Sequence, residues 1–119
     1  MNLIKPIVIV AGEPESVFFE IFFKSIKKLK IKSPIILIGS KNLIKYHMKK
    51  YSFKKKLRLL NKNKINHRIL NNKYLNLIYL NYNPLNNQKN QYLESNKYLS
   101  KCFETAVTII KKYKYNKFI

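Results

Sequence analysis

Two mainly apolar runs constrain the fold of this chain more than any other feature of its sequence. The first occupies residues 4–11 and the second residues 35–39, which follow a Ser-Pro pair and end on glycine. Both runs are rich in β-branched residues, and neither alternates with polar side chains. This pattern is typical of strands that are buried on both faces, as in a parallel sheet.

Each apolar run is followed by a segment with helical periodicity. Residues 15–28 predict a helix, because apolar side chains recur at three- and four-residue spacing and glutamates precede lysines in the order that the helix dipole favours. The expected apolar stripe comprises Val17, Phe18, Ile21, Phe22, Phe23, Ile26 and Leu29. Ser40 can cap a second helix over residues 41–51. Alternating strands and helices with short connections predict a doubly wound α/β sheet.

The middle of the chain is less regular. Residues 54–60 and 65–70 each have the composition of a short strand, and the Asn- and Lys-rich residues 61–64 separate them as a turn. Residues 75–80 predict a strand more clearly. Residues 81–91 are polar and contain one proline, so we interpret them as an ordinary connection rather than as a binding loop.

A long amphipathic helix is predicted over residues 92–113, and residues 115–119 resemble the approach to a further strand. The expected apolar face of the helix comprises Leu93, Tyr98, Leu99, Cys102, Phe103, Ala106, Val107, Ile109 and Ile110. Such a face is what a helix needs to cover a sheet.

The net charge of +20 has two interpretations. Lysine supplies all but two of the 25 basic residues, and lysine, asparagine, isoleucine and tyrosine share AT-rich codons. A nucleic-acid partner would explain the charge, but arginine, which binds phosphates and bases in bidentate fashion, is nearly absent and the lysines are scattered. We therefore favour a genome that has drifted toward A and T, with the lysines on a solvated surface. The positive charge still implies nonspecific affinity for polyanions.

The sequence indicates a cytoplasmic protein without a membrane segment. Its apolar runs are far shorter than the roughly 20 residues that cross a bilayer, and two glutamates stand where a signal peptide would need small residues for cleavage. Cys102 is the single cysteine, which excludes an internal disulfide.

No set of residues forms a recognisable catalytic or metal-binding motif. The turn after the first strand, residues 12–16, lies where helix amides can bind anions, but Glu13 and Glu15 would repel a phosphate and no glycine-rich loop is present. His47 and His67 have no ligand at metal-binding spacing, so we expect both to be structural or surface residues. Cys102 is interpreted as a small core residue.

One stretch near the start of the chain resembles the 4-hydroxythreonine-4-phosphate dehydrogenase family. In that family Gly-Asp/Glu-Pro-Ala-Gly-Ile-Gly-Pro-Glu follows the first strand, and Gly12, Glu13, Pro14 and Glu20 match it without a gap. Ser16, Phe18 and Phe19 replace the family's Gly, Gly and Pro, which alters the tight part of the loop.

Two further stretches agree in order and spacing. Residues 34–40 are similar to the family's second strand, Pro-x-Val-x-Ile-Gly-Asp, and residues 91–106 are similar to a family helix that begins with Gln, Glu and Tyr and carries Ala later. Tyr98 and Ala106 match this helix, whereas Asn96 replaces a glycine.

The resemblance implies an α/β fold with a partial doubly wound, mainly parallel sheet like that of the isocitrate and isopropylmalate dehydrogenases. It implies a cytoplasmic homodimer that uses NAD(P) and a divalent metal to oxidise a phosphorylated hydroxy-amino acid in pyridoxal phosphate (vitamin B6) biosynthesis. No specific nucleic acid and no membrane are expected as partners.

The resemblance covers about the first third of a family member, so residues 1–119 are expected to be a single amino-terminal segment of a longer domain. The family's substrate-binding His-Thr pair and its three metal-binding histidines come later. We therefore assign no catalytic, cofactor-binding or metal residue, leave the role of Glu13 open, and expect the chain alone to be inactive. The alternatives are a small basic nucleic-acid-binding α/β protein and a decaying gene product that folds poorly.

Overall fold

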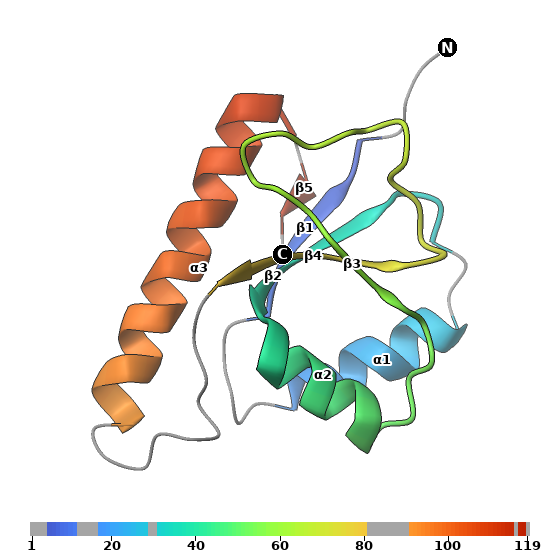
Figure 1. Cartoon of the computed structure of the whole chain (residues 1–119), viewed down its shortest axis with the longest axis vertical. Helices are drawn as coiled ribbons and strands as arrows, with labels where there is room; N and C mark the ends of the chain where they lie inside the picture. The colour runs from blue at the N-terminus through green and yellow to red at the C-terminus, as the bar shows by residue number, and fades with distance from the viewer. Residues whose placement is uncertain (1–4, 12–16, 29–30, 81–90, 116, 119) are drawn as a thin grey trace.

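The chain folds into a single parallel sheet with helices on both faces (Figure 1). The computed structural model describes residues 5–11, 17–28, 31–80, 91–115 and 117–118, with the backbone alone for 91–95 and 117–118. The elements in chain order are β1 (Ile7–Ala11), α1 (Phe18–Lys28), β2 (Ile35–Ser40), α2 (Lys41–Lys50), β3 (Leu57–Leu59), β4 (Leu75–Leu80), α3 (Gln91–Tyr113) and β5 (Lys117–Phe118). All four strand pairings are parallel, as predicted.

The strand order β3-β4-β2-β1-β5 explains why the helices lie on two faces. The chain first moves outward from β1 to β2 and on to β3, and then returns through β4 to β5 on the other side of β1. Crossovers between parallel strands are nearly always right-handed, so a reversal of direction places the later crossover on the opposite face. Accordingly, α1 and α2 pack on one face, and α3 packs on the other (Figure 1).

Side chains that alternate along the strands supply two cores, one on each face of the sheet. In β2, which is buried along its whole length, Ile35 and Leu37 face α1 and α2, whereas Ile36 and Ile38 face α3. Central strands in a parallel sheet need this double burial.

The α1 stripe that contacts the sheet is narrower than expected. Phe19, Phe22 and Phe23 are buried, but Val17 and Ile21 are 66% and 60% exposed, contrary to the prediction that they belong to the packed face. At 3.6 residues per turn these two positions lie on the side of the helix opposite the buried stripe.

The same correction applies to α3. The side of this helix that packs against the sheet carries the buried residues Tyr98, Cys102, Ala106 and Ile109. Two other residues of the expected face, Phe103 and Val107, are therefore about half exposed.

The predicted strand over residues 65–70 is wrong, and the strand predicted over 54–60 is confined to β3. Residues 65–70 form turns because the side chain of Asn66 accepts a hydrogen bond from the N–H of Arg68 (3.0 Å), and the carbonyl of Asn66 accepts one from Ile69 (3.3 Å). Such local bonds compete with strand pairing. Ile65 and Leu70 are nevertheless buried against the α3 face of the sheet, so this connection covers part of the core.

The second helix forms as predicted. Ser40 is its N-cap, and its Oγ accepts a hydrogen bond from the N–H of Leu43 (3.2 Å). The polar connection predicted over 81–91 lies almost wholly outside the described residues. No helix in the described ranges is long and apolar enough to cross a membrane.

Candidate functional site at the carboxyl ends of the strands

In α/β sheets, ligands bind outside the carboxyl ends of the strands, at the point where neighbouring crossovers leave toward opposite faces. Here β2 is followed by α2 on one face, and its neighbour β4 is followed by α3 on the other. The carboxyl ends of β2 and β4, with β1 beside them, are therefore where the topology predicts a site.

The hydroxyl of Tyr98 joins the carboxyl ends of β1 and β2. Their ladder begins where the N–H of Ile7 donates to the residue before β2 (2.8 Å), and it ends with Ala11 opposite Gly39. One further rung of a parallel ladder would join the N–H of Ser40 to the carbonyl of Ala11. The Tyr98 hydroxyl occupies this position, since it accepts from Ser40 N–H (2.6 Å) and donates to the Ala11 carbonyl (3.2 Å).

Gly39 leaves the space that this arrangement needs. A Cβ atom at Gly39 would lie 2.7 Å from the carbonyl oxygen of Ala11 and 2.9 Å from the hydroxyl of Tyr98. The first distance is to backbone, which cannot move away without disturbing β1. Glycine is therefore required here for close approach.

Ser40 connects this junction to α2, because its N–H donates to Tyr98 while its Oγ caps the helix. One buried side chain of α3 thus fixes the end of β1, the end of β2 and the start of α2. We call Ala11, Gly39, Ser40 and Tyr98 the tyrosine junction.

Cys102 lies one turn after Tyr98 and is fully buried, as the sequence predicted for a core residue. Burial raises the pKa of its thiol to about 11, although a hydrogen bond with Tyr98 opposes the shift. A thiol that stays protonated at neutral pH is a poor nucleophile. The role of Cys102 is packing.

The two histidines take no part in the junction and lie on opposite faces of the sheet. His47 is buried between α1 and α2, where its ring stacks on Phe19 with centroids 4.2 Å apart. His67 lies over the other face, where its Nε2 shares a hydrogen bond with the hydroxyl of Tyr115. Burial raises the pKa of Tyr115 to about 12, with a further contribution from Tyr113. Both histidines pack against aromatic rings, which agrees with their structural interpretation.

Beyond β1, the structure describes residues 17–20 of the first family-like stretch, which ends at Glu20. Its carboxylate forms an ion pair with Lys24 (2.8 Å), and this hydrogen bond lowers the pKa of Glu20. Glu13 and the rest of residues 12–16 lie outside the described residues.

The residues in the described ranges bring no three His, Cys, Asp or Glu side chains together for a metal ion. The tyrosine junction was not predicted as a site. Tyr98 was identified in sequence as part of an apolar face and of a family-like helix, but only the fold shows that its hydroxyl reaches residues 58 and 87 positions away.

Comparison with known proteins shows a likeness in structure. No protein-family model matches the chain, and no curated protein matches it. The crystal structure of a 4-hydroxythreonine-4-phosphate dehydrogenase from Burkholderia phymatum is similar, with a TM-score of 0.75 and 14% sequence identity. The match covers 98% of this chain and 36% of that chain, so the chain spans about a third of the enzyme's length. The chain therefore has the fold of part of a 4-hydroxythreonine-4-phosphate dehydrogenase, as the family-like stretches predicted.

Proposed function

We propose that residues 1–119 are the amino-terminal α/β segment of an NAD(P)-dependent oxidoreductase of the 4-hydroxythreonine-4-phosphate dehydrogenase type, which acts in pyridoxal phosphate biosynthesis. The observation that carries the proposal is the tyrosine junction. The three family-like stretches, residues 6–20, 34–40 and 91–106, were identified separately along the chain, and Ala11, Ser40 and Tyr98 belong to one stretch each. Their meeting at the carboxyl ends of the strands supports a common origin with the enzyme whose fold the chain shares.

In this proposal the segment is a scaffold. The tyrosine junction holds the end of β1, from which residues 12–17 lead to α1, and so fixes one wall of the region where a phosphorylated hydroxy-amino acid would bind. The described residues do not fit a metal ion, and we derive no step through a metal or NAD(P) from them. The segment alone is expected to be inactive, since metal-assisted oxidation needs ligands that the family places later in its sequence.

Exposed apolar side chains support the presence of further structure in the active protein. Val17, which directly precedes α1, Ile21 on α1, and Phe103 and Val107 on α3 are each between 46% and 66% exposed. Large apolar side chains grouped on a helix surface commonly mark contacts with other parts of a protein. We propose that the remainder of the enzyme and a second subunit cover them in a cytoplasmic homodimer.

The test compares two preparations, the 119-residue chain and the natural gene product isolated from its source cells with an antibody against this chain. Each is incubated with 4-hydroxythreonine 4-phosphate, NAD⁺ and a divalent metal, and NADH is followed by its absorbance. We expect the natural product to form NADH and a chelator to abolish this activity, while the 119-residue chain forms none.

A natural product that unfolds cooperatively yet forms no NADH would contradict the proposal. NADH formation by the 119-residue chain, sensitive to a chelator, would contradict its assignment as an inactive scaffold. A broad, non-cooperative thermal transition would instead identify a chain that folds poorly.

A further inference from the structure

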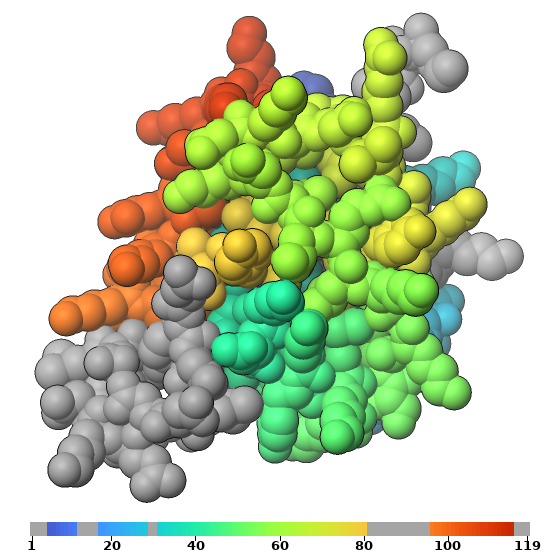
Figure 2. Space-filling view, viewed as in Figure 1, coloured from blue at the N-terminus to red at the C-terminus, as the bar shows by residue number. Residues whose placement is uncertain are grey.

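A groove lined by lysines runs between α2 and the edge strand β3. It encloses about 530 Å³. Its lining residues are Lys41, Lys45, Met48, Lys49, Phe53, Lys56, Leu57 and Leu59. α2 and the segment that leads into β3 lie side by side on the face shown in Figure 2. The groove thus combines a basic rim with an apolar floor.

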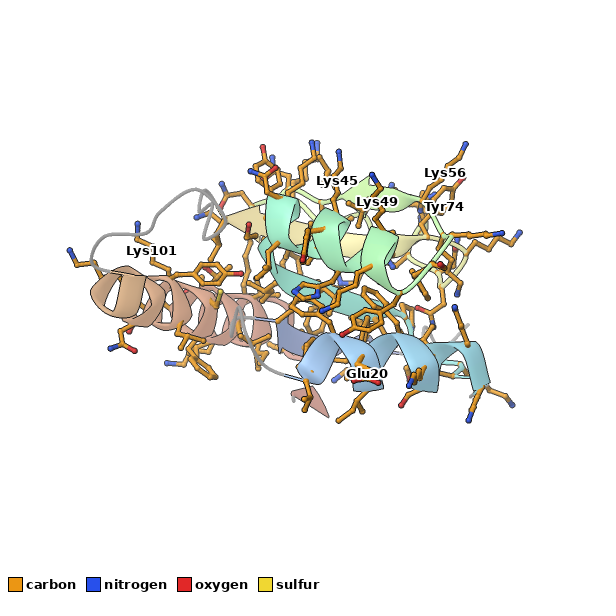
Figure 3. The ribbon with its side chains drawn as sticks, turned by 90° about the horizontal axis from the view of Figure 1, so that it is seen from below. Glu20, Lys45, Lys49, Lys56, Tyr74 and Lys101 are labelled. Atoms are coloured by element: carbon orange, nitrogen blue, oxygen red, sulfur yellow. The ribbon has the colours of Figure 1, made fainter. Side chains whose placement is uncertain are left out.

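The charges of the rim are not compensated within the groove, since all its charged lining residues are lysines. Lys41, Lys45 and Lys49 follow one another at four-residue spacing on α2, where like charges repel. Lys41 also occupies the first turn, where the helix dipole disfavours a cation. Figure 3 shows Lys45, Lys49 and Lys56 on one side of the molecule and Glu20 on the other. An anionic partner would relieve this repulsion.

The backbone of β3 offers an open edge beside the same lysines. The carbonyl of Lys56 accepts from Leu75 (2.9 Å), and the N–H of Leu60 donates to Leu77 (2.8 Å), so the even-numbered residues bond to β4. Successive residues of a strand direct their N–H and C=O groups to opposite sides, which places those of Leu57 and Leu59 on the outer edge. β3 is the last strand of the described sheet. An edge strand of this kind can accept another strand.

We propose that the groove binds an extended acidic segment of another protein, which adds to β3 as a sixth strand. Its backbone bonds to Leu57 and Leu59, and the acidic side chains that the added strand directs to the α2 face meet Lys45 and Lys49. A strand added at the normal spacing would lie about 4.8 Å from β3, beneath the lysines of α2. This inference is independent of the proposed enzymatic function.

Other occupants fit the groove less well. A second copy of this chain would bring the same lysines against each other, and the net charge of +20 opposes such pairing. A single-stranded nucleic acid would match the charge, but its binding sites also offer aromatic rings on which the bases stack. Phe53, the one aromatic lining residue, is only 6% exposed.

The proposal is tested by fluorescence anisotropy with two labelled probes, an eight-residue Glu-Val repeat and an oligothymidine. The Lys45→Glu/Lys49→Glu variant should weaken peptide binding by about tenfold or more. The matched control, Lys97→Glu/Lys101→Glu, makes the same charge change at the same spacing on exposed positions of α3. It should weaken peptide binding by about twofold at most, through net charge alone.

A second variant separates strand addition from charge attraction. Leu59→Pro removes an outward N–H that takes no part in the ladder with β4, a position where an edge strand tolerates proline. It should weaken peptide binding at least about fivefold and oligothymidine binding by less than about twofold, with an unchanged circular dichroism spectrum. Equal effects of the two lysine pairs, or tighter binding of oligothymidine that Leu59→Pro leaves unchanged, would overturn the proposal.

Discussion

A single hydroxyl, that of Tyr98, joins parts of the chain that are distant in sequence. Because it bonds to the backbone of both β1 and β2, its removal would leave the buried N–H of Ser40 without the acceptor it has here. An unsatisfied buried donor costs more than the net strength of the bond itself. The junction is therefore expected to contribute both to stability and to the shape of the strand ends.

Tyr98→Phe should lower the free energy of unfolding by about 1–3 kcal/mol, since the ring still fits but the hydroxyl is lost. Urea denaturation followed by circular dichroism measures the change. Tyr46→Phe is the control, because Tyr46 is 47% exposed and loses little when its hydroxyl is removed. Equal stabilities of the two variants would contradict the role assigned to Tyr98.

The thiol of Cys102 makes stability depend on alkaline pH. Its pKa is raised from the usual 9.0 to about 11 in the folded state, so its contribution is fully present below pH 9 and is lost as the pH rises toward 11. The slope is at most about 1.4 kcal/mol per pH unit for one group. Urea denaturation of the wild type and of Cys102→Ala across this range should show their difference shrinking as pH rises. A constant difference would show that the thiol does not titrate as described.

At the scale of elements, asparagine side chains hold the connections that sequence periodicity did not resolve. The side chain of Asn72 accepts from the N–H of Ile35 (2.9 Å) and donates to the carbonyls of Ile31 (3.1 Å) and Ser33 (2.8 Å). It ties the end of the β3–β4 connection to the start of β2. With the turn bonds of Asn66, this link explains why residues 65–70, whose composition suggested a strand, belong to an irregular connection.

Asn72→Asp tests this link, because it keeps the acceptor for Ile35 but replaces two donated bonds with repulsion between oxygens. We expect a loss of about 2–4 kcal/mol in the free energy of unfolding at neutral pH. Asn66→Asp is the matched control, since the exposed Asn66 only accepts through its side chain, from Arg68, and aspartate can do the same. A similar loss in both variants would contradict the importance of the donated bonds.

Elements with strong apolar periodicity were predictable from sequence, but the rotation of each helix against the sheet was not. The runs that became β1, β2 and β4 and the helices that follow were identified because apolar spacing reports burial. Which apolar residues of α1 and α3 face solvent, such as Ile21 and Val107, depends on how each helix rotates against the sheet. The tyrosine junction depends on contacts between residues far apart in the chain, which periodicity does not report.

At the scale of the whole molecule, the charge of +20 opposes the compact state. Within the described ranges a single salt bridge, Lys24 with Glu20, offsets this repulsion. The thermal midpoint should therefore rise by a few degrees between about 0.05 and 0.5 M sodium chloride, as the Debye length falls. Differential scanning calorimetry measures it, and Lys97→Glu/Lys101→Glu should show a smaller rise. A midpoint independent of salt in both proteins would contradict this account.

The parallel sheet is the claim on which the junction, the groove and the likeness to the dehydrogenase all depend. Long-range nuclear Overhauser effects in a ¹³C,¹⁵N-labelled sample test it most directly. We predict contacts that ascend together along both strands, from Val8 with Ile36 to Val10 with Ile38. A set of contacts in which the β2 partner number falls as the β1 number rises would show antiparallel strands and contradict the account.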